Sequence, residues 1–395
     1  MLDHPIDRRG ILAGGGAFGI AACAGLIETA CAPRAASGGA YAPWAMWDDP
    51  AIRGTPLALV AAAILAANPH DTQPWRFRVA EDRIEVFADL SRNLGAMDAY
   101  VRELHLGLGC ALQNALVAAG PNGFSAELAV KAGSLGALTE RRTPVLAATL
   151  HLGRLAPTPP DASHLAIARR HTNRFAYHRD RPLPGAWREA VLELWAGEGV
   201  RLVLFDDGPA RGAFDAAVLD ATAAIIADAA MIADSDRWFR ATRAEVEAHR
   251  DGPTLETAGL SPLKLALVRT LPISPRATHS AWLRQTNAVQ LASAPLTGLI
   301  CVRDRYDRSG AIAAGRVWQR LHLDATVRGI ALQPLNQPIE MIDRERQRGV
   351  GEAWARRIAE LTGPDWQATF AFRAGYPTVE APASPRRALR DVVTA

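Results

Sequence analysis

The sequence Arg-Arg-His-Thr-Asn-Arg, at residues 169–174, brings three arginines, an imidazole and a hydroxyl together near the middle of a 395-residue chain. Guanidinium groups bind phosphate oxygens through charge-assisted hydrogen bonds, and a hydroxyl adds a neutral donor. The segment therefore predicts a phosphate-binding site. One alternative stays open: residues 162–168 predict a short helix capped by Asp161 or Ser163, and cations in a last helical turn are favourable without any ligand.

A proline-rich loop is the second distinctive segment, and it reads Asn68-Pro69-His70-Asp71-Thr72-Gln73-Pro74-Trp75. It follows residues 56–67, whose apolar run and early proline predict a buried helix that ends before Pro69. Residues 76–79 and 83–88 alternate in polarity, which predicts a pair of strands. By itself the loop is either a surface turn that packs one tryptophan on the core or the rigid wall of a ligand site.

The remaining chain predicts a mixture of helices and strands. A long central helix is expected at 102–120, where Gly107, Gly109 and Ala111 leave room for a second helix to cross closely. Further helices are expected at 187–195, 222–238 and 315–326, and strands at 200–205, 297–302 and 370–376. Residues 328–338 predict a glycine-started strand running into a proline-bracketed loop, and the irregular charged segment 239–260 is interpreted as a lid-like insertion.

Four of these segments, in this order, resemble the motifs of the nitroreductase-like flavoproteins. The loop with Gln73-Pro74-Trp75 is similar to the family's A-P-S-x-x-N-x-Q-P-W, and residues 170–174 to its phosphate motif R-(R/H)-S-x-(R/K), with Thr172 in place of serine. Residues 328–338 resemble G-(V/I)-x-x-x-P-I-E-G, and residues 384–389 resemble the closing K-P-R-x-P-L. The resemblance extends from about residue 50 to residue 392.

The resemblance implies an α+β fold of the nitroreductase-like type and FMN as the cofactor. It implies a phosphate site made by Arg170, His171, Thr172, Arg174 and Arg386. It also implies a flavin ring bordered by Asn68, Pro69, Asp71 and Gln73, and by backbone groups of Pro334, Leu335, Asn336 and Gln337.

Asp71 stands where the family signature has asparagine. An ionised carboxylate accepts hydrogen bonds but does not donate them, and it disfavours negative charge nearby. If Asp71 faces the ring, it is expected to lower the flavin's potential. If it turns away, it caps another group instead.

The order of the motifs implies an unusual architecture. Family members of about two hundred residues carry both the ring loop and the phosphate motif in each subunit. Here the loop lies in a first half, residues 48–160, and the phosphate motif opens a second half, residues 161–395. The resemblance therefore implies two fused, diverged copies packed as an intramolecular pseudo-dimer, as in the Acg-type branch, with one flavin site and a monomeric chain.

The amino terminus resembles a twin-arginine export signal. Arg8 and Arg9 precede an apolar, glycine-rich run from residue 11 to residue 27. Residues 1–32 are interpreted as the signal and residues 33–47 as a linker, with cleavage near Cys31 or lipid attachment at Cys23 as the two alternatives. An ordinary amphipathic helix is the third. The signal implies the twin-arginine export machinery as a partner and a periplasmic or other extracytoplasmic location, with a lipid anchor in the second alternative.

Composition and charge exclude several classes of function. The apolar fraction of 49%, the charged fraction of 22% and the net charge of +3 are those of a globular protein. Because the chain has no long basic tract, no nucleic-acid partner is expected. The cysteines lack C-x-x-C spacing and a His/Cys cluster, so no metal site is expected, and Cys110 and Cys301 are predicted to be buried thiols.

The leading functional hypothesis is an oxidoreductase that passes electrons through FMN from a small-molecule donor to a small acceptor, such as a nitroaromatic compound or a quinone. Because the cofactor carries this chemistry, no particular catalytic side chain is demanded. Consistent with that, the sequence has no G-x-S-x-G elbow, P-loop or Rossmann fingerprint. Two alternatives are a flavin-sequestering protein with little turnover and a helical binding scaffold without flavin.

Overall fold

The computed structural model describes residues 39–137, 143–193, 199–270 and 275–394. The signal-like segment 1–32 and residues 33–38 of the expected linker lie outside the described residues. The described residues form one compact unit. The strands are β1 Trp75–Val79, β2 Arg83–Ala88, β3 Phe124–Val130, β4 Val145–Arg154, β5 Val200–Phe205, β6 Leu296–Val302, β7 Ala331–Pro334, β8 Gln367–Gly375 and β9 Val393–Thr394. The α-helices are α1 Ala42–Met46, α2 Pro56–Ala63, α3 Arg102–Ala119, α4 Ala162–Ala166, α5 Gly185–Glu193, α6 Pro209–Ala227, α7 Ala229–Asp236, α8 Arg243–His249, α9 Pro262–Thr270, α10 Pro275–Gln285, α11 Arg308–Val327, α12 Gln337–Arg348, α13 Ala353–Thr362 and α14 Leu389–Val392.

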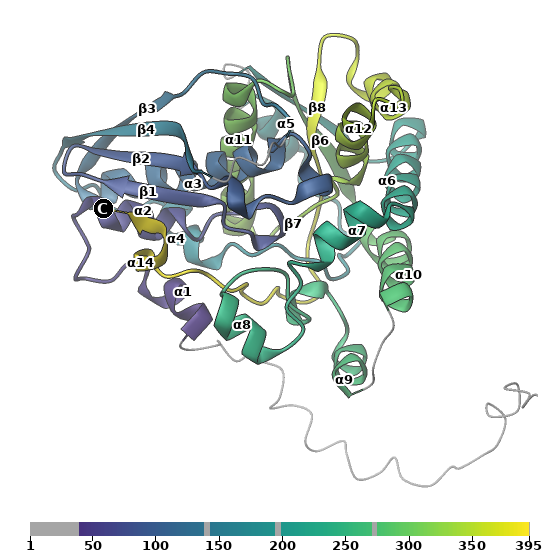
Figure 1. The fold of residues 1–395 in the computed structure, drawn as a ribbon, viewed down its shortest axis with the longest axis horizontal. Helices are drawn as coiled ribbons and strands as arrows, with labels where there is room; N and C mark the ends of the chain where they lie inside the picture. Colours follow the sequence, from purple (N-terminus) through teal and green to yellow (C-terminus); the bar gives the residue numbers. More distant parts are fainter. Residues whose placement is uncertain (1–38, 138–142, 194–198, 271–274, 395) are drawn as a thin grey trace, which may run out of the picture. The chain divides into compact units, whose positions relative to one another are not determined.

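Two sheets flank a central pair of helices (Figure 1). The first sheet has the order β3-β4-β2-β1-β9 and the second has the order β5-β6-β8-β7. In Figure 1, β1 to β4 lie on the left, α3 and α11 lie in the centre, and α6, α12 and α13 lie on the right. The predicted α+β class is confirmed.

The inner strands of the second sheet, β6 and β8, are buried on both faces apart from Gln367 at the start of β8. Every residue of β6 is buried, and its alternate side chains join different clusters: Ile300 packs in the large central core, whereas Leu299 and Cys301 pack in a second core with α6, α12 and α13. Continuous burial explains why this strand reads as an unbroken apolar run. Cys110 and Cys301 are buried thiols, as predicted.

Helices α3 and α11 cross closely because glycine lies at the contact on both sides. A Cβ atom at Gly109 would overlap the carbonyl oxygen of Ile312, and one at Gly315 would overlap the carbonyl oxygen of Leu106. The Cys110 thiol also donates to the carbonyl oxygen of Gly315 over 3.2 Å. The crossing expected from the small residues in 102–120 is therefore present, and α11 is the partner helix.

The two sheets draw on different parts of the chain, with one exception. Strands β1 to β4 and helix α3 come from residues 75–154, whereas β5 to β8 and α11 come from residues 200–375. The exception is β9, which pairs parallel to β1 with Phe77 opposite Val393. The carboxyl-terminal segment thus leaves the second sheet and completes the edge of the first.

Several expected elements have different bounds in the structure. The helix expected at 222–238 begins at Pro209 and is interrupted at Asp228, whose side chain caps α7 through the backbone N–H groups of Ala230 and Met231. The helix expected from residue 315 begins at Arg308. The prediction of a proline-bracketed loop at 328–338 is wrong in part, because α12 begins at Gln337 and includes Pro338. Proline is well tolerated in the first turn of a helix.

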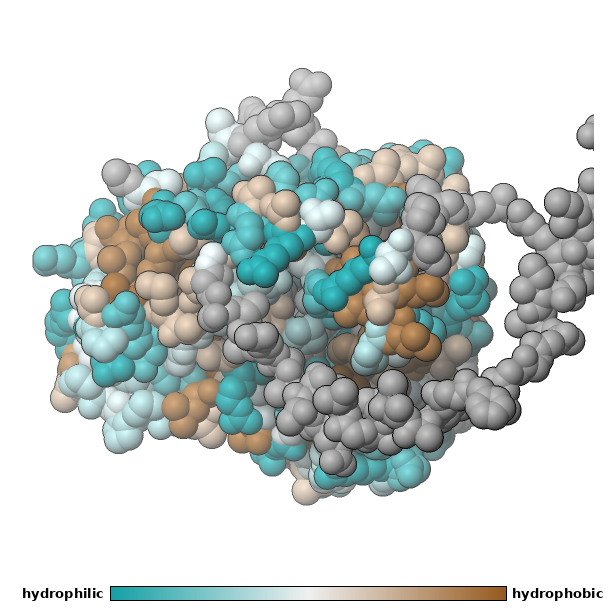
Figure 2. All heavy atoms as spheres, turned by 90° about the horizontal axis from the view of Figure 1, so that it is seen from below, coloured by the Kyte–Doolittle hydropathy of each residue, from teal (hydrophilic) through white to brown (hydrophobic). Residues whose placement is uncertain are grey.

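No single helix among the described residues is long and apolar enough to cross a membrane. Helices α6 and α7, which are bent relative to each other, together have the length and composition of a membrane-crossing segment. On the face seen in Figure 2, hydrophobic residues gather in separate patches with hydrophilic residues between them.

Candidate functional site

Two adjoining cavities lie where the loop 68–73, the segment 170–174 and the segment 253–258 meet. The larger has a volume of about 580 Å³ and the smaller about 50 Å³. A volume of several hundred Å³ is usual for cofactor sites. Seven residues line both cavities, which shows that the two spaces share a wall: Ala67, Asn68, His70, Thr172, Arg174, Pro253 and Thr257.

The small cavity is basic. Its wall carries the guanidinium groups of Arg170, Arg174 and Arg386 and one carboxylate, Asp71, so its formal charge is three minus one, or +2. His171 and Thr172 complete the polar wall. The structure thus places all five residues expected at the phosphate site around one space, although Arg386 lies more than two hundred positions from the others in the sequence.

Two of these arginines also have a structural role. Arg170 donates from Nη2 to the carbonyl oxygen of Leu65 over 3.0 Å, and Arg386 donates from Nη2 to that of Ala66 over 3.2 Å. Carbonyl groups at the end of a helix lack partners within the helix, so the two arginines supply hydrogen bonds to the carbonyl groups that follow α2. The Nε atoms of both arginines nevertheless have no hydrogen-bond partner among the described residues.

In the small cavity, the positive charge of the three arginines exceeds the negative charge of the single carboxylate. Burial, together with the positive charge of Arg386, lowers the pKa of Arg170 to about 9. Burial, with the charges of Arg170 and Arg386, lowers the pKa of His171 to about 3, so this imidazole is neutral at pH 7. Because a nearby anion would stabilise the charged guanidinium groups, the site is suited to a dianionic group.

Asp71 faces the small cavity and not the large one. Its Oδ1 accepts from Arg386 Nη1 over 2.5 Å and from Asn68 Nδ2 over 3.3 Å. Burial raises the pKa of Asp71 to about 7, against the opposing effect of Arg386. The expectation that this carboxylate lowers the potential of a ring therefore does not apply, because the side chain lies beside the phosphate-type site.

Gln73 and Leu335 were expected at the cofactor and contribute no wall to either cavity. Gln73 is fully buried and links three chain segments: its Nε2 donates to the carbonyl oxygen of Arg250 over 2.8 Å and its Oε1 accepts from Arg387 N over 2.7 Å. Leu335 is fully buried in the second hydrophobic core. The structure thus places both residues behind the cavity walls, in packing and positioning roles.

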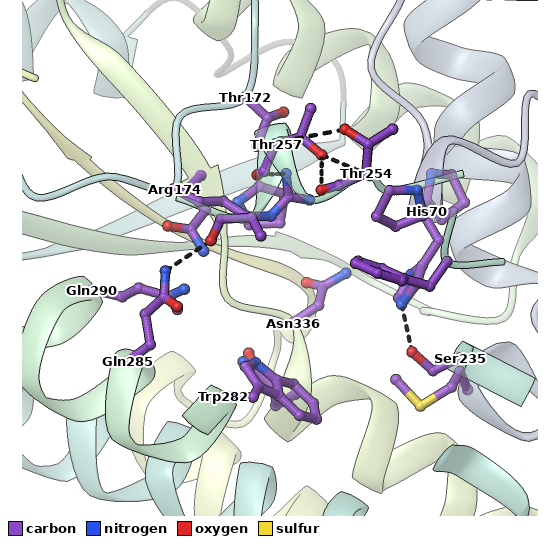
Figure 3. A pocket seen from close by; sticks show the side chains of 18 of the residues that line it. His70, Thr172, Arg174, Ser235, Thr254, Thr257, Trp282, Gln285, Gln290 and Asn336 are labelled. Carbon is purple, nitrogen blue, oxygen red and sulfur yellow. Dashed lines mark hydrogen bonds between the residues drawn. The ribbon is translucent and has the colours of Figure 1, made fainter. Parts of the chain in front are cut away.

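The other expected residues line the large cavity. Asn68 and Pro69 contribute from the loop, and Pro334, Asn336 and Gln337 contribute from the end of β7 and the start of α12. Asn336 is held in place, since its Nδ2 donates to Glu103 Oε1 over 2.8 Å and its Oδ1 accepts from Ala371 N over 2.8 Å. In Figure 3, Asn336 lies between His70 on one side and Arg174 on the other.

The loop 68–73 approaches α3 closely and has an uncommon backbone. A Cβ atom at Gly107 would lie 3.0 Å from Pro69 Cδ, so a glycine at this position allows the loop to pack closely against α3. His70, Asp71 and Gln73 all have positive φ, at 46°, 49° and 50°. Non-glycine residues rarely adopt this conformation, and such backbone is concentrated at functional sites.

The large cavity is covered by residues 253–258 and by helices α9 and α10. Leu255, Val268 and Trp282 are among the covering side chains. The loop 68–73 is bonded to segments next to this cavity wall: Gly252 N donates to the carbonyl oxygen of Asp71 over 3.1 Å, and His70 Nε2 lies 3.1 Å from Ser235 Oγ of α7 (Figure 3). A lid was predicted at residues 239–260, whereas α9, α10 and Trp282, whose helical pattern carries no motif, were not predicted to line this cavity.

Comparison with curated proteins finds similarity to putative nitroreductases. No family model matches the sequence. Two curated proteins of Mycobacterium tuberculosis, each described as a putative NAD(P)H nitroreductase, are 26% identical to this chain over 358 residues, or 85% of this chain and 90% of theirs. This similarity supports the nitroreductase-like family that the motifs indicate.

Solved structures with similarity to this chain include two nitroreductases. One is a nitroreductase with bound FMN from Desulfitobacterium hafniense, which is 11% identical, covers 60% of this chain and 98% of its own, and has a TM-score of 0.36. The other is the FMN-dependent nitroreductase NfnB from Mycobacterium smegmatis in complex with NADPH, which is 18% identical, covers 59% and 97%, and has a TM-score of 0.38. Similarity at this level bears on neither ligand nor reaction.

Proposed function

We propose that the chain binds FMN in the two adjoining cavities and is an oxidoreductase of the nitroreductase-like family. The observation that carries this proposal is the small cavity of formal charge +2, lined by three arginines, which shares its wall with a cavity of about 580 Å³. A phosphate monoester carries close to two negative charges at pH 7 and accepts bonds from guanidinium groups. The adjoining cavity gives room for the ring.

The residues present fit such a cofactor. Arg170, Thr172, Arg174 and Arg386 would hold the phosphate, and the wall from Pro334 to Gln337 would border the ring. Bound FMN supplies hydride or electron transfer, and the protein supplies position, charge and exclusion of water. The curated relatives, described as putative NAD(P)H nitroreductases, support a small-molecule electron donor. The acceptor, a nitroaromatic compound or a quinone, is part of the proposal.

The experiment is a spectrum followed by anaerobic reduction. We expect the purified protein, after incubation with FMN and desalting, to retain the yellow flavin spectrum. We expect NADPH or NADH to bleach it without oxygen, and a nitroaromatic or quinone to restore it. Absence of flavin absorbance would leave a binding scaffold without flavin and would overturn the proposal.

A second candidate is a flavin-binding protein with little turnover. The side chains that residues 253–258, α9 and α10 contribute to the wall of the large cavity favour it, because they narrow the access of a donor and an acceptor to the ring. In that case neither nicotinamide bleaches the flavin, whereas dithionite does so slowly. The same anaerobic titration therefore separates the two candidates.

Replacing Asp71 by asparagine is expected to strengthen FMN binding about tenfold at pH 8, because a negative charge beside the phosphate is removed. The pKa of Asp71, raised to about 7, sets the pH window. At pH 6 the wild-type carboxyl is already protonated, so the two proteins should bind alike; as pH rises past 7, only wild type loses affinity. Quenching of flavin fluorescence at both pH values measures this, and equal affinities at pH 8 would contradict it.

We also propose the finer parts of the resemblance for this chain: an Acg-type pseudo-dimer that is monomeric in solution, and export to an extracytoplasmic location. The paired arginines Arg8 and Arg9 before an apolar run support export. Replacing both by lysine should then leave the full-length precursor in the cytoplasm. Processing that continues unchanged would count against export by this route.

A further inference from the structure

Besides the arginines, the large cavity has two buried carboxyl groups in its wall. Glu103 stands in the first turn of α3 and Glu340 in the first turn of α12, and their exposed fractions are 6% and 5%. Glu103 Oε1 accepts from Asn336 Nδ2 over 2.8 Å and from Arg102 Nη2 over 3.3 Å. Glu340 Oε2, in contrast, has no hydrogen-bond partner among the described residues.

A neighbouring amide has the same property. Gln337, one turn earlier on α12, has an exposed fraction of 7% and lines the cavity, and its Oε1 also has no partner among the described residues. A buried polar atom left without a partner is costly, so such atoms call for a ligand or another explanation. Glu340 and Gln337 together indicate that a ligand with a polar group binds at this wall.

Charge balance indicates which form of Glu340 faces the cavity. Arg102 donates from Nε to Asp343 Oδ2 over 2.9 Å, and Tyr306 donates its hydroxyl to Asp343 Oδ1 over 2.9 Å. The cluster holds the carboxyl groups of Asp98, Glu103, Glu340 and Asp343, and Arg102 is the cation paired with it, through Asp343 and Glu103. One arginine does not balance four carboxylates, so carboxyl groups left without a cation are more stable as neutral acids. Burial and the neighbouring carboxylates raise the pKa values of both Glu103 and Glu340. The charged and titratable groups around Glu340 are Asp98, Arg102, Glu103 and Asp343, and Asp343 in turn interacts with Arg305 and Tyr306.

We propose that Glu340 is a carboxylic acid that donates a proton to the carbonyl oxygen of a quinone bound as electron acceptor in the large cavity. The inference rests on the proposed function. Reduction of a quinone to a hydroquinone adds two electrons and two protons. Reduced flavin, if bound as in the proposed function, would supply a hydride, which carries two electrons and one proton. The O–H bond of Glu340 breaks to supply the second proton, and solvent returns a proton to the carboxylate.

The arrangement also selects among acceptors. A neutral acid donates a hydrogen bond to a carbonyl or nitro oxygen, whereas an ionised carboxylate would repel it. A donor already placed beside the reacting oxygen accelerates proton transfer. The Gln337 amide, on the same wall, offers a second polar contact to the acceptor.

The first test uses flavin-free protein, so its outcome does not depend on the proposed function. Infrared spectra of wild type at pH 7.5 should contain a protonated-carboxyl band that is reduced in Glu340→Gln. The matched control is Glu345→Gln, on the same helix, whose carboxylate accepts from Trp354 N over 2.9 Å and which lies outside the cavity wall. An unchanged band in Glu340→Gln would overturn the assignment.

The second test measures reoxidation of the reduced flavoprotein by stopped flow. With benzoquinone we expect Glu340→Gln to be at least tenfold slower than wild type and Glu345→Gln to match wild type. The wild-type rate should fall as Glu340 ionises at high pH, and the variant should lose this pH dependence. Ferricyanide takes up an electron without a proton, so it should reoxidise both proteins at similar rates.

The outcomes separate the two proposals. Equal benzoquinone rates and equal pH profiles in wild type and Glu340→Gln would overturn the proton-donor role while leaving the flavin proposal in place. Equal slowing with benzoquinone and with ferricyanide would also overturn it, since that result shows a general defect at the flavin. A wild-type protein that binds no flavin would overturn the proposed function, and the infrared result would still report on Glu340.

Discussion

Replacing Arg174 by glutamine is expected to weaken FMN binding about 100-fold, because a charge-assisted contact to phosphate is lost at about 2–3 kcal/mol. Arg174 is the best of the three arginines for this test. It lines both cavities, and its Nη1 donates to one carbonyl oxygen, that of Thr257, over 3.2 Å. Arg170 and Arg386 also hold the chain after α2, so their loss would mix binding with folding.

The control is the neighbouring charge in the same motif. Arg169 is the exposed last residue of a short 3₁₀ helix at Ile167–Arg169, so Arg169→Gln should leave FMN affinity within about twofold. Riboflavin provides a second control, since it lacks the phosphate. Arg174→Gln should remove most of the wild-type preference for FMN over riboflavin, and an unchanged preference in a folded variant would defeat the phosphate assignment.

Replacing Gly315 by alanine is expected to destabilise the protein by about 2–3 kcal/mol, because the added Cβ overlaps the backbone of α3 and forces the helices apart. For a unit of this size the melting temperature should fall by about 4 °C. Thermal unfolding followed by circular dichroism measures the change.

The matched control is the same substitution at an exposed helical glycine. Gly212 lies in α6 and has no atom within 4 Å of an added Cβ. Alanine there should be neutral or stabilising by about 1 kcal/mol, because alanine favours the helix. Equal melting temperatures for the two variants would show that the close crossing contributes little to stability.

Local sequence predicted the parts of the site that depend on short motifs. The helix start at Asp161 is an example, since its carboxylate accepts from His164 N over 2.7 Å as the capping pattern indicates. The approach of Arg386 to Arg170 followed from the family resemblance and from nothing local. Glycine spacing in α3 indicated a close crossing but not the identity of the partner helix.

What the sequence did not predict depends on contacts between distant residues. The direction of Asp71 follows from Arg386, which is 315 positions away, and the role of Gln73 follows from Arg250 and Arg387. The helices over the large cavity were missed because α9 has no buried residue and α10 is mostly polar. The unpartnered oxygen of Glu340 is visible only when α3 and α12 are placed together.

Arg170 and Arg386 of the small cavity, from the middle and the carboxyl-terminal part of the chain, contact the carbonyl groups of residues 65 and 66. A ligand bound among them would act as a noncovalent cross-link between the amino-terminal helix region, the middle of the chain and its carboxyl-terminal segment. Its binding free energy would add to the stability of the assembled whole, since none of the three parts forms the site alone. If any one of the three regions separated from the others, the ligand would be released. The absorbance of a bound flavin would therefore follow the cooperative unfolding of the protein.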